Sequence, residues 1–321
     1  MNPEFSVIIP SYNHEEYIGD AIESVINQTF KDWELIIIDD GSTDNSVEVI
    51  RRYEDPRIKL FTQTNHDAPY TINRGMKEAR GKYIAILNSD DLFDPIKLEE
   101  CKKYLSKGYE FVFGKLKVIN DKNQKISGKD ERVMWIDKHL NNFKEEPTLK
   151  KLLLNINYII TTSNLSFNRK VLEKVGYFHE KLRISHDFDY LIRIFEKDLR
   201  IKFIPEYLAS YRIHSKNTLS RGRVESFLES CYAMDGLFRR NTEMRKKFPL
   251  SFFHEPIIKN ILSFYASLSD KEAAEIAKDK ENPNRKKLEK MINSYFAGSR
   301  FSRKLKDAIT NVKQLFKRNN K

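Results

Sequence analysis

The stretch YIAILNSDDLFDP, residues 83–95, joins a strand to a dense run of polar side chains. Residues 83–87 are apolar and favour extended backbone, which is typical of a strand covered on both faces of a parallel sheet. The strand leads directly into Asn88 and the carboxylates Asp90, Asp91 and Asp94. Carboxylates this close in sequence repel one another unless a cation lies among them. The stretch therefore predicts a buried strand that delivers acids to a cation site.

The same alternation of strand and helix extends over the N-terminal third of the chain. Short apolar runs predict strands at residues 6–10, 34–39, 58–61, 83–88 and 110–113. Between them, residues 17–26 and 47–53 have apolar side chains at helical spacing. Residues 69–79 and 95–105 each begin with a proline, which is favoured in the first turn of a helix. Strands that alternate with helices indicate an α/β protein with a parallel sheet.

The pattern changes beyond residue 113. Residues 114–140 are polar and rich in lysine, which indicates a hairpin or an excursion from the sheet. The next block predicts a helix at 147–155, a strand at 161–167, a helix at 185–196 and a pair of strands within 201–213. From residue 221 onward the patterns are helical and charged. We therefore expect an α/β domain at 1–220 and a helical, basic region at 221–321.

The composition is that of a folded globular protein, since 40% of the 321 residues are hydrophobic and 12% are aromatic. No apolar run approaches the roughly 20 residues that a membrane-spanning helix needs. The chain enters a strand-like run at residues 5–9 without a charged segment and a long apolar stretch before it, so we expect no secretory signal. These features predict a cytoplasmic location.

The formal net charge of +11 is concentrated toward the C-terminus. Residues 300–321 contain eight basic residues and one acid, together with apolar residues spaced as on one face of a helix: Phe301, Leu305, Ile309, Val312 and Phe316. Such a helix can lie on the anionic inner face of the cell membrane as a peripheral contact. It can equally dock on its own protein. We expect no nucleic-acid partner, because no aromatic side chains suited to stacking alternate with these basic residues.

The carboxyl ends of the predicted strands carry the candidate site, because ligands of open α/β sheets bind there. Tyr12 offers a flat face to a nucleobase, and Asp40 can accept a hydrogen bond from a ring N–H. Asp90 and Asp91 can hold a hard divalent cation that bridges phosphate oxygens. Each piece also has a plainer interpretation, since residues 39–41 can form a simple turn and Asp94 can cap the helix after it. Together the strand ends predict a metal–nucleotide site.

Two long segments of the chain resemble a known enzyme family. SVIIPSYNHEEYIGDAIESVINQTFKDWELIIIDDGSTDNS (residues 6–46) and INRGMKEARGKYIAILNSDDLFDP (residues 72–95) resemble the family-2 glycosyltransferases, which are inverting enzymes of the GT-A fold. The resemblance is close over residues 5–115 and looser to residue 214. It implies a Rossmann-like mixed, mainly parallel sheet flanked by helices, here with a helical C-terminal extension.

The resemblance implies roles for several residues of the candidate site. The nucleotide-sugar-binding positions are Pro10, Tyr12, Asp40, Asn73, Asn88 and Ser89. The D-x-D motif of the family falls on residues 88–90, where Asn88 replaces the first acid, so Asp90 becomes the leading ligand of Mn²⁺ or Mg²⁺. An amide can still bond a ribose hydroxyl but brings no charge. Ile72 stands where many relatives have an arginine, which leaves the contacts of this loop open.

Two later segments complete the expected site. RISHDFDYLIRIFEK (residues 183–197) resembles the acidic motif that supplies the base of the family, and Asp187 takes that position. His186 stands where relatives usually have a glutamate. YRIHSKNTLS (residues 211–220) resembles segments that close over the donor, so Arg212 is expected to meet the diphosphate and His214 to be a further metal ligand. A structural role for either side chain remains the alternative.

The resemblance implies transfer of a sugar from a UDP-sugar to a hydroxyl of a glycan or lipid-linked saccharide, as in surface polysaccharide synthesis. A phosphatase with an aspartate nucleophile needs a second acid two residues later, and Gly41 and Ser42 occupy those positions. A Gly-Lys-Ser/Thr phosphate loop is absent from the sequence. The remaining alternative is a noncatalytic nucleotide-sugar-binding scaffold whose basic tail binds a membrane or a partner.

Overall fold

The computed structural model describes residues 2–126, 128–141, 159–214 and 217, with single residues between 226 and 240. The chain divides into two compact units, Met1–Asn217 and Thr218–Lys321, and every helix and strand named below belongs to the first. The helix expected at 147–155 and the basic helix expected near the C-terminus lie outside the described residues. The helical region expected from residue 221 lies mostly outside them.

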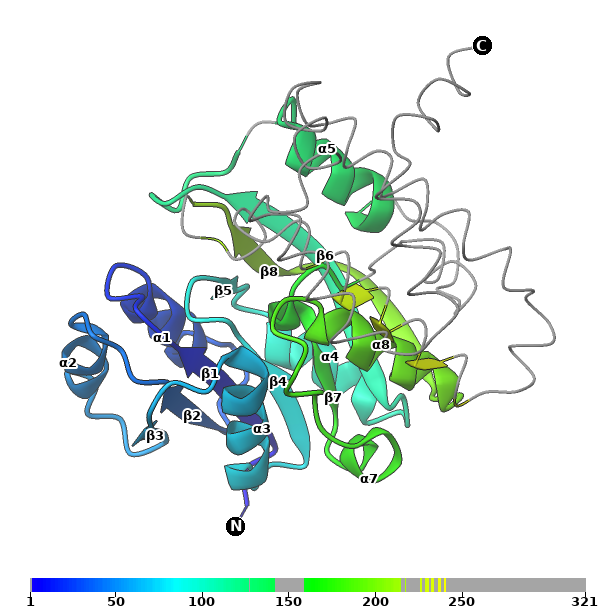
Figure 1. The fold of residues 1–321 in the computed structure, drawn as a ribbon, viewed down its shortest axis with the longest axis horizontal. Helices are drawn as coiled ribbons and strands as arrows, with labels where there is room; N and C mark the ends of the chain where they lie inside the picture. The colour runs from blue at the N-terminus through cyan, green and yellow to red at the C-terminus, as the bar shows by residue number, and fades with distance from the viewer. Residues whose placement is uncertain are drawn as a thin grey trace, which may run out of the picture. The chain divides into compact units, whose positions relative to one another are not determined.

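An eight-stranded sheet forms the centre of the first unit (Figure 1). Its strands lie in the order β3-β2-β1-β4-β7-β6-β8-β5. Their bounds are β1 Phe5–Ser11, β2 Trp33–Asp39, β3 Ile58–Thr62, β4 Tyr83–Ile86, β5 Leu92–Phe93, β6 Phe111–Ile119, β7 Ser166–Asn168 and β8 Ile201–Arg212.

The strand directions make a mixed, mainly parallel sheet. Strands β3, β2, β1 and β4 run parallel to one another. Strand β7 runs antiparallel to both β4 and β6, and β8 runs parallel to β6. Strand β8 therefore points the same way as β4. Because of these directions, the carboxyl ends of β1, β2, β4 and β8 lie at one edge of the sheet.

Helices cover the sheet and connect its strands. Their bounds are α1 Ile18–Ile26, α2 Ser46–Arg51, α3 Ala68–Glu78, α4 Lys97–Leu105, α5 Glu131–Ile136, α7 Val171–Val175 and α8 His186–Glu196. Helix α3 packs on β1 and β2, and α4 packs on β6 and β8. A side chain at Gly75 would place its Cβ 2.4 Å from Cγ2 of Ile8, so this glycine allows α3 to approach β1 closely.

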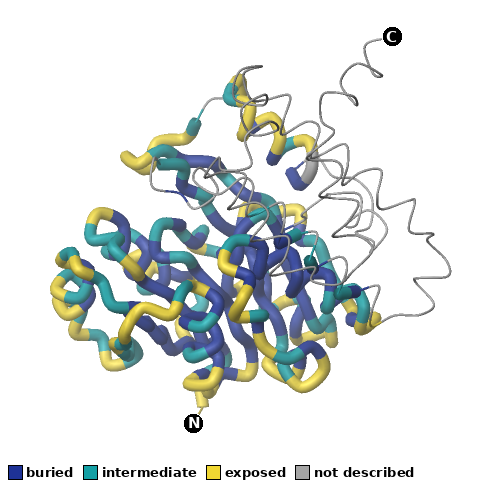
Figure 2. The backbone as a smooth tube through the Cα atoms, in the orientation of Figure 1, coloured by how far each residue is buried: buried dark blue, intermediate teal, exposed yellow. Residues whose placement is uncertain are grey.

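The hydrophobic core is built around strands whose residues are mostly apolar and buried. Strands β1 and β2 are buried at all seven of their positions, as expected of strands covered on both faces (Figure 2). Burial of this apolar surface is the main stabilising contribution to such a core. The polar side chains at the strand ends are thereby fixed on a rigid support.

The second half of the sheet differs from the sequence-based expectation in three places. Residues 201–212 form the single strand β8 rather than a pair of strands, because shifts of register beside Lys115 keep β8 aligned with β6 over its whole length. The strand expected at 161–167 is shorter, because Thr162–Asn164 form a 3-10 turn before β7 begins. Residues 114–119 extend β6 instead of leaving the sheet, and the excursion begins after Ile119.

Asp94 contacts the start of the following helix, which begins at Lys97. Its Oδ1 accepts a long hydrogen bond from the backbone N–H of Ile96 at 3.5 Å, and its backbone oxygen accepts from the N–H of Lys97 at 2.9 Å. Its other carboxylate oxygen forms an ion pair with Lys117 on β6 at 2.5 Å. Among the described residues, no helix has the length and apolar character needed to cross a membrane.

Candidate active site

The first part of the site is the tight contact between the segments that follow β1 and β2. The register pairs Ser11 with Asp39, so both strands end at the same level. Both oxygens of Asp39 accept hydrogen bonds from Ser42, from its backbone N–H at 2.9 Å and from its hydroxyl at 2.6 Å. Gly41 has a φ of 78°, a conformation that glycine adopts without strain. Asp39 therefore shapes the turn that carries the next residue, Asp40.

Asp40 is the carboxylate of this turn that has hydrogen bonds to only one of its two oxygens within the described residues. Its side chain is buried, and Oδ1 accepts hydrogen bonds from Nε2 of Gln63 at 2.7 Å and from the backbone N–H of His66 at 2.9 Å. Its Oδ2 has no hydrogen bond within the described part of the chain. A carboxylate oxygen held in this way can accept a hydrogen bond from a ring N–H.

Pro10 and Tyr12 flank the end of β1. Pro10 is buried within the strand, opposite Ile38, and Tyr12 is 46% exposed directly after it. An exposed aromatic ring beside the Asp40 turn is suited to stacking on a base. The structure therefore places both residues at the strand end where the sequence predicts nucleoside contacts.

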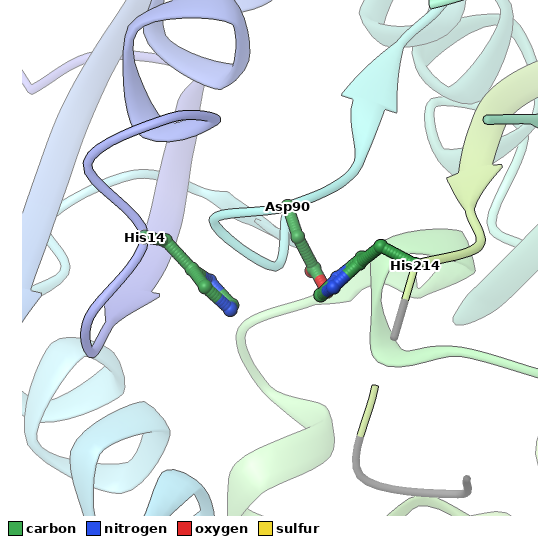
Figure 3. A group of neighbouring side chains, drawn as sticks. All are labelled: His14, Asp90 and His214. Carbon is green, nitrogen blue, oxygen red and sulfur yellow. The ribbon is translucent and has the colours of Figure 1, made fainter. Parts of the chain in front are cut away.

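A cluster of two histidines and one aspartate lies where β1, β4 and β8 end. Figure 3 shows the side chains of His14, Asp90 and His214 pointing toward one another. Their possible ligand atoms all lie within 4.8 Å of one another. Nε2 of His214 is 3.0 Å from Oδ2 of Asp90, and Nδ1 of His14 is 2.7 Å from the Ser89 hydroxyl. The two imidazole rings are 5.8 Å apart and nearly perpendicular.

Asp90 and Asp91 differ in their electrostatic surroundings although they are adjacent. Burial would raise the pKa of Asp90, but the hydrogen bond from His214 and the charges of His14 and His214 outweigh it and lower the pKa. Burial and the neighbouring Asp90 charge raise the pKa of Asp91 to about 7. The surroundings therefore favour the ionised form more strongly at Asp90 than at Asp91.

The Asp91 side chain is a structural anchor rather than a ligand. Its Oδ2 accepts hydrogen bonds from the hydroxyls of Ser163 at 2.5 Å and Thr161 at 3.0 Å. Its Oδ1 accepts from the backbone N–H of Arg212 at 2.9 Å. Asp91 thus joins the end of β4 to the 3-10 turn and to the end of β8.

Asn88 and Ser89, expected to contact the nucleotide sugar, form hydrogen bonds within the fold. The Asn88 amide donates to Thr161 Oγ1 at 2.9 Å, and its oxygen accepts from the Thr162 hydroxyl at 2.5 Å. The Ser89 hydroxyl is buried against His14. In this structure both side chains orient their neighbours, and a contact with the donor stays a prediction.

Arg212, expected to meet the diphosphate, is fully buried. Its Nε donates to the backbone oxygen of Asp90 at 2.6 Å, and Nη1 donates to the side chain of Asn123. Nη2 lies 3.4 Å from the carboxylate of Asp20. The guanidinium therefore supports the turn that carries Asp90, because each of its nitrogens is engaged within the fold.

Asn73, also expected to bind the donor, connects α3 to the segment before α8. Its amide nitrogen donates to the backbone oxygen of Phe178 at 3.0 Å and to Glu180 at 3.1 Å. Its oxygen accepts from the backbone N–H of Phe178 at 2.8 Å. These bonds engage both ends of the amide, so the structure gives Asn73 a supporting role.

Asp187 is the second residue of α8 and is 9% exposed. Its Oδ1 accepts a hydrogen bond from the backbone N–H of Phe188 at 2.7 Å. The positive end of a helix dipole favours an ionised carboxylate at this position. Asp189 is engaged differently, because it forms an ion pair with Arg193 at 2.9 Å.

Tyr211 connects the base candidate with the metal candidate. Burial, together with the charges of Asp91, Asp90 and Asp187, raises the pKa of its phenol. The Tyr211 phenol therefore lies within electrostatic reach of the carboxylates of both Asp90 and Asp187.

The donors of the cluster fit a divalent cation. Asp90 supplies one negative charge, and His14 and His214 supply imidazole nitrogens. Three donors of this kind would leave further coordination positions of a divalent cation open. Sequence reasoning named Asp90 and His214 but missed His14. Its signal was its place in the sequence, since it follows the residues considered at the end of the first strand, 10–13.

Comparisons with known proteins agree on one family. The model of the family described as glycosyl transferase family 2 matches residues 6–176. An uncharacterized glycosyltransferase of Methanocaldococcus jannaschii, MJ1057, is 32% identical over 231 residues, which are 68% of this chain and 74% of that protein. The glucosyltransferase WfgD of Escherichia coli is 40% identical over 126 residues, 39% of this chain and 49% of that protein. The match to an uncharacterized glycosyltransferase of Rickettsia bellii spans only 33% of that relative's length.

Solved structures share the fold. Staphylococcus aureus TarS 1–349 in complex with UDP-GlcNAc gives a TM-score of 0.65 at 17% identity, over 92% of this chain and 82% of that chain. The mannosyltransferase PcManGT of Pyrobaculum calidifontis, in complex with GDP-Man and Mn²⁺, gives 0.55 at 16% identity, over 93% and 89%. Both are GT-A glycosyltransferases, so the fold class expected from the sequence is confirmed.

Proposed function

This chain belongs to glycosyl transferase family 2, and we propose that it transfers a sugar from a UDP-sugar to a hydroxyl of a glycan or lipid-linked saccharide, with inversion. The observation that carries the proposal is that the first unit of the chain holds three groups suited to this reaction. These are the buried Asp40 carboxylate, the cluster of His14, Asp90 and His214, and Asp187 at the start of α8. They supply, in that order, a group that recognises the nucleobase, a site for a divalent cation and a general base that accepts a proton.

Asp40 and Tyr12 bind the nucleoside in this proposal. Uracil carries a ring N–H at position 3, and Oδ2 of Asp40 can accept it while Gln63 and His66 hold Oδ1. Tyr12, which is exposed beside this turn, stacks on the ring. The TarS complex with UDP-GlcNAc supports a uridine nucleotide as the donor.

Asp90 and His214 would hold a divalent cation, Mn²⁺ or Mg²⁺. The bound cation supplies positive charge that stabilises the leaving diphosphate. The lowered pKa of Asp90 keeps this carboxylate ionised for that role. The PcManGT complex with Mn²⁺ supports a cation in this fold.

Asp187 accepts the proton of the attacking hydroxyl. A single displacement at the anomeric carbon inverts its configuration, and it requires a base on the side opposite the leaving group. Asp187 is suited to this role because its carboxylate lies at a helix N-terminus and because Phe188 fixes one of its oxygens. The other acid of this turn, Asp189, is engaged by Arg193.

The acceptor class rests on a relative. WfgD is described as a glucosyltransferase acting on an α-D-GlcNAc-diphosphoundecaprenol, which supports a lipid-linked saccharide as the acceptor here. Contact of the basic segment 300–321 with an anionic membrane surface would bring the site to such an acceptor. That segment lies outside the described residues, so the membrane contact is part of the proposal.

The second candidate function is a noncatalytic scaffold that binds a nucleotide sugar. It is favoured by Asn88, because the amide at the first position of the metal motif is engaged by Thr161 and Thr162 and brings no charge. The two functions make different demands on Asp187. An enzyme requires this carboxylate for turnover, whereas a scaffold does not.

The test compares the full-length wild type with Asp187→Asn and the matched control Asp189→Asn. Each is incubated with UDP-hexoses and UDP-N-acetylhexosamines, an undecaprenyl-diphosphate-linked GlcNAc acceptor and Mn²⁺, while UDP binding is measured by calorimetry. We expect Asp187→Asn to bind UDP normally and to lose turnover by about 10²–10⁴-fold, the size of a general-base contribution. The control should turn over because its amide oxygen can still accept from Arg193. UDP binding without turnover in the wild type would contradict the enzyme and support the scaffold.

A further inference from the structure

We propose that His14 is a third protein ligand of the cation and that Ser89 is the residue that orients it. The inference deepens the proposed function and rests on it, because it concerns the same cation site. The supporting geometry is direct. The possible ligand atoms of His14, Asp90 and His214 lie within 4.8 Å of one another, and the three side chains point toward a common point (Figure 3).

The backbone at His14 is held in place by the segment that follows β2. The backbone N–H of His14 donates to the Ser46 hydroxyl at 3.0 Å, and that of Glu15 donates to Asp44 at 3.0 Å. Asn45 donates back to the Glu15 carboxylate through its backbone at 3.0 Å and through its side chain at 2.6 Å. These reciprocal bonds fix the position of the His14 Cα before any ligand arrives.

Ser89 fixes the His14 ring. The Ser89 hydroxyl is buried and lies 2.7 Å from Nδ1 of His14. A histidine that binds a metal through one nitrogen commonly donates its other N–H to a neighbouring oxygen, which sets the tautomer. With Nδ1–H donating to Ser89, Nε2 carries the lone pair and serves as the ligand atom. Ser89, expected to contact the donor, becomes a positioning residue.

The third ligand determines which cations the site prefers. Oxygen ligands suit both Mg²⁺ and Mn²⁺, but Mg²⁺ has little affinity for imidazole nitrogens, whereas Mn²⁺, as a transition-metal ion, also binds them. A site with Asp90 alone would separate Mn²⁺ from Mg²⁺ weakly. A site with two imidazoles and one carboxylate binds Mn²⁺ better than Mg²⁺, and His14 accounts for part of that preference.

The experiment measures Mn²⁺ binding directly, by the loss of the free-ion signal in electron paramagnetic resonance, with UDP present. The full-length wild type is compared with His14→Gln, Ser89→Ala and the control His179→Gln, a histidine outside the cluster. We expect the Mn²⁺ affinity to fall about 10–100-fold in Ser89→Ala and at least as much in His14→Gln, in keeping with the loss of an orienting partner or a ligand. The control should bind as the wild type does.

Competition with Mg²⁺ separates a ligand from a merely structural residue. His14→Gln should reduce the ratio of Mn²⁺ to Mg²⁺ affinity, and its melting temperature without metal should stay near that of the wild type. Unchanged Mn²⁺ affinity in His14→Gln would overturn the inference while leaving sugar transfer intact. An equal loss of Mn²⁺ and Mg²⁺ affinity would also overturn it. Failure of the proposed function would appear elsewhere, as an absence of turnover in the wild type.

Discussion

Two pairs of adjacent aspartates lie at the carboxyl ends of strands in the same sheet. Asp39 and Asp40 stand at the end of β2, and Asp90 and Asp91 follow β4. In each pair, one carboxylate holds the fold and the other faces the site. After β2 the first acid is structural, because Asp39 accepts both of its bonds from Ser42. After β4 the order is reversed, because Asp91 is the structural member and Asp90 lies against His214.

The two structural carboxylates, Asp39 and Asp91, differ in how far away in the sequence their hydrogen-bond donors lie. Asp39 is satisfied by Ser42, which is three residues away in sequence. Asp91 is satisfied by Ser163, Thr161 and Arg212, which are 70 to 121 residues away. The first turn is therefore a local structure, whereas the second exists only when distant parts of the sheet have assembled. Substitutions in the two pairs should reflect this difference.

Among substitutions in the two aspartate pairs, the largest effect is expected from Asp90→Asn. This change removes the only charged ligand of the described cluster while an amide preserves the size of the side chain. We expect turnover with Mn²⁺ to fall about 10²–10³-fold, as for loss of one electrostatic group in an active site. The free energy of unfolding without metal should change little. Steady-state kinetics and urea denaturation measure the two quantities. Turnover close to the wild-type level would show that Asp90 is not the member of the Asp90–Asp91 pair that acts in the site.

Asp91→Ala, unlike Asp90→Asn, should act mainly by lowering the free energy of unfolding. It leaves two hydroxyls and the backbone N–H of Arg212 without their common acceptor in a buried environment. We expect a loss of about 2–4 kcal/mol in the free energy of unfolding, since unsatisfied buried donors are costly. Asp91→Asn keeps an acceptor and should lose less, as urea denaturation of the two variants would show. Equal stability of Asp91→Ala and the wild type would show that Asp91 does not anchor the sheet.

Asp40→Asn should change which nucleotide binds. Gln63 and His66 hold the amide oxygen where Oδ1 was, so the amide NH₂ replaces Oδ2. An NH₂ group repels the N3–H of uracil but matches N3 of cytosine, which is an acceptor. We expect UDP affinity to fall by about 10-fold or more, the size of one lost charge-assisted hydrogen bond and one unpaired group. Calorimetry with UDP and CDP measures the ratio of the two affinities. An unchanged preference for UDP would show that Asp40 does not contact the nucleobase.

The smallest effect is expected from Asp39→Asn. Its partner Ser42 lies in the same turn, and an asparagine can still accept one of the two bonds. We expect a loss of about 1 kcal/mol in the free energy of unfolding. Urea denaturation beside Asp91→Ala compares the two structural acids directly. A loss as large as that of Asp91→Ala would show that the β2 turn also depends on distant contacts.

The sequence predicts those features that depend on local pattern. The continuous apolar runs predict β1, β2 and β4, and the apolar stripe and acidic start predict α8. The strand ends therefore located Asp40 and Asp90, and the resemblance added Asp187.

Sequence reasoning could not assign the roles that depend on distant partners. Arg212 was expected at the diphosphate, yet the turn behind Asp90 surrounds its guanidinium. Asn73 and Asn88 are predicted to bind the donor, but the sequence did not show that their amides also bond to Phe178 and to Thr161, which lie 105 and 73 residues away. The role of His14 depends on Ser89, 75 residues further on. Hydrogen bonds between residues so far apart in sequence depend on the order of the strands in the sheet, and local sequence patterns do not predict that order.

The most direct test is anomalous diffraction at the manganese edge from crystals of the full chain grown with UDP and Mn²⁺. Our account predicts one anomalous peak bounded by His14, Asp90 and His214, with the uracil ring hydrogen-bonded to Asp40 in the same crystal. A manganese peak at Asp91 instead, or none in this cluster while UDP is bound, would contradict it.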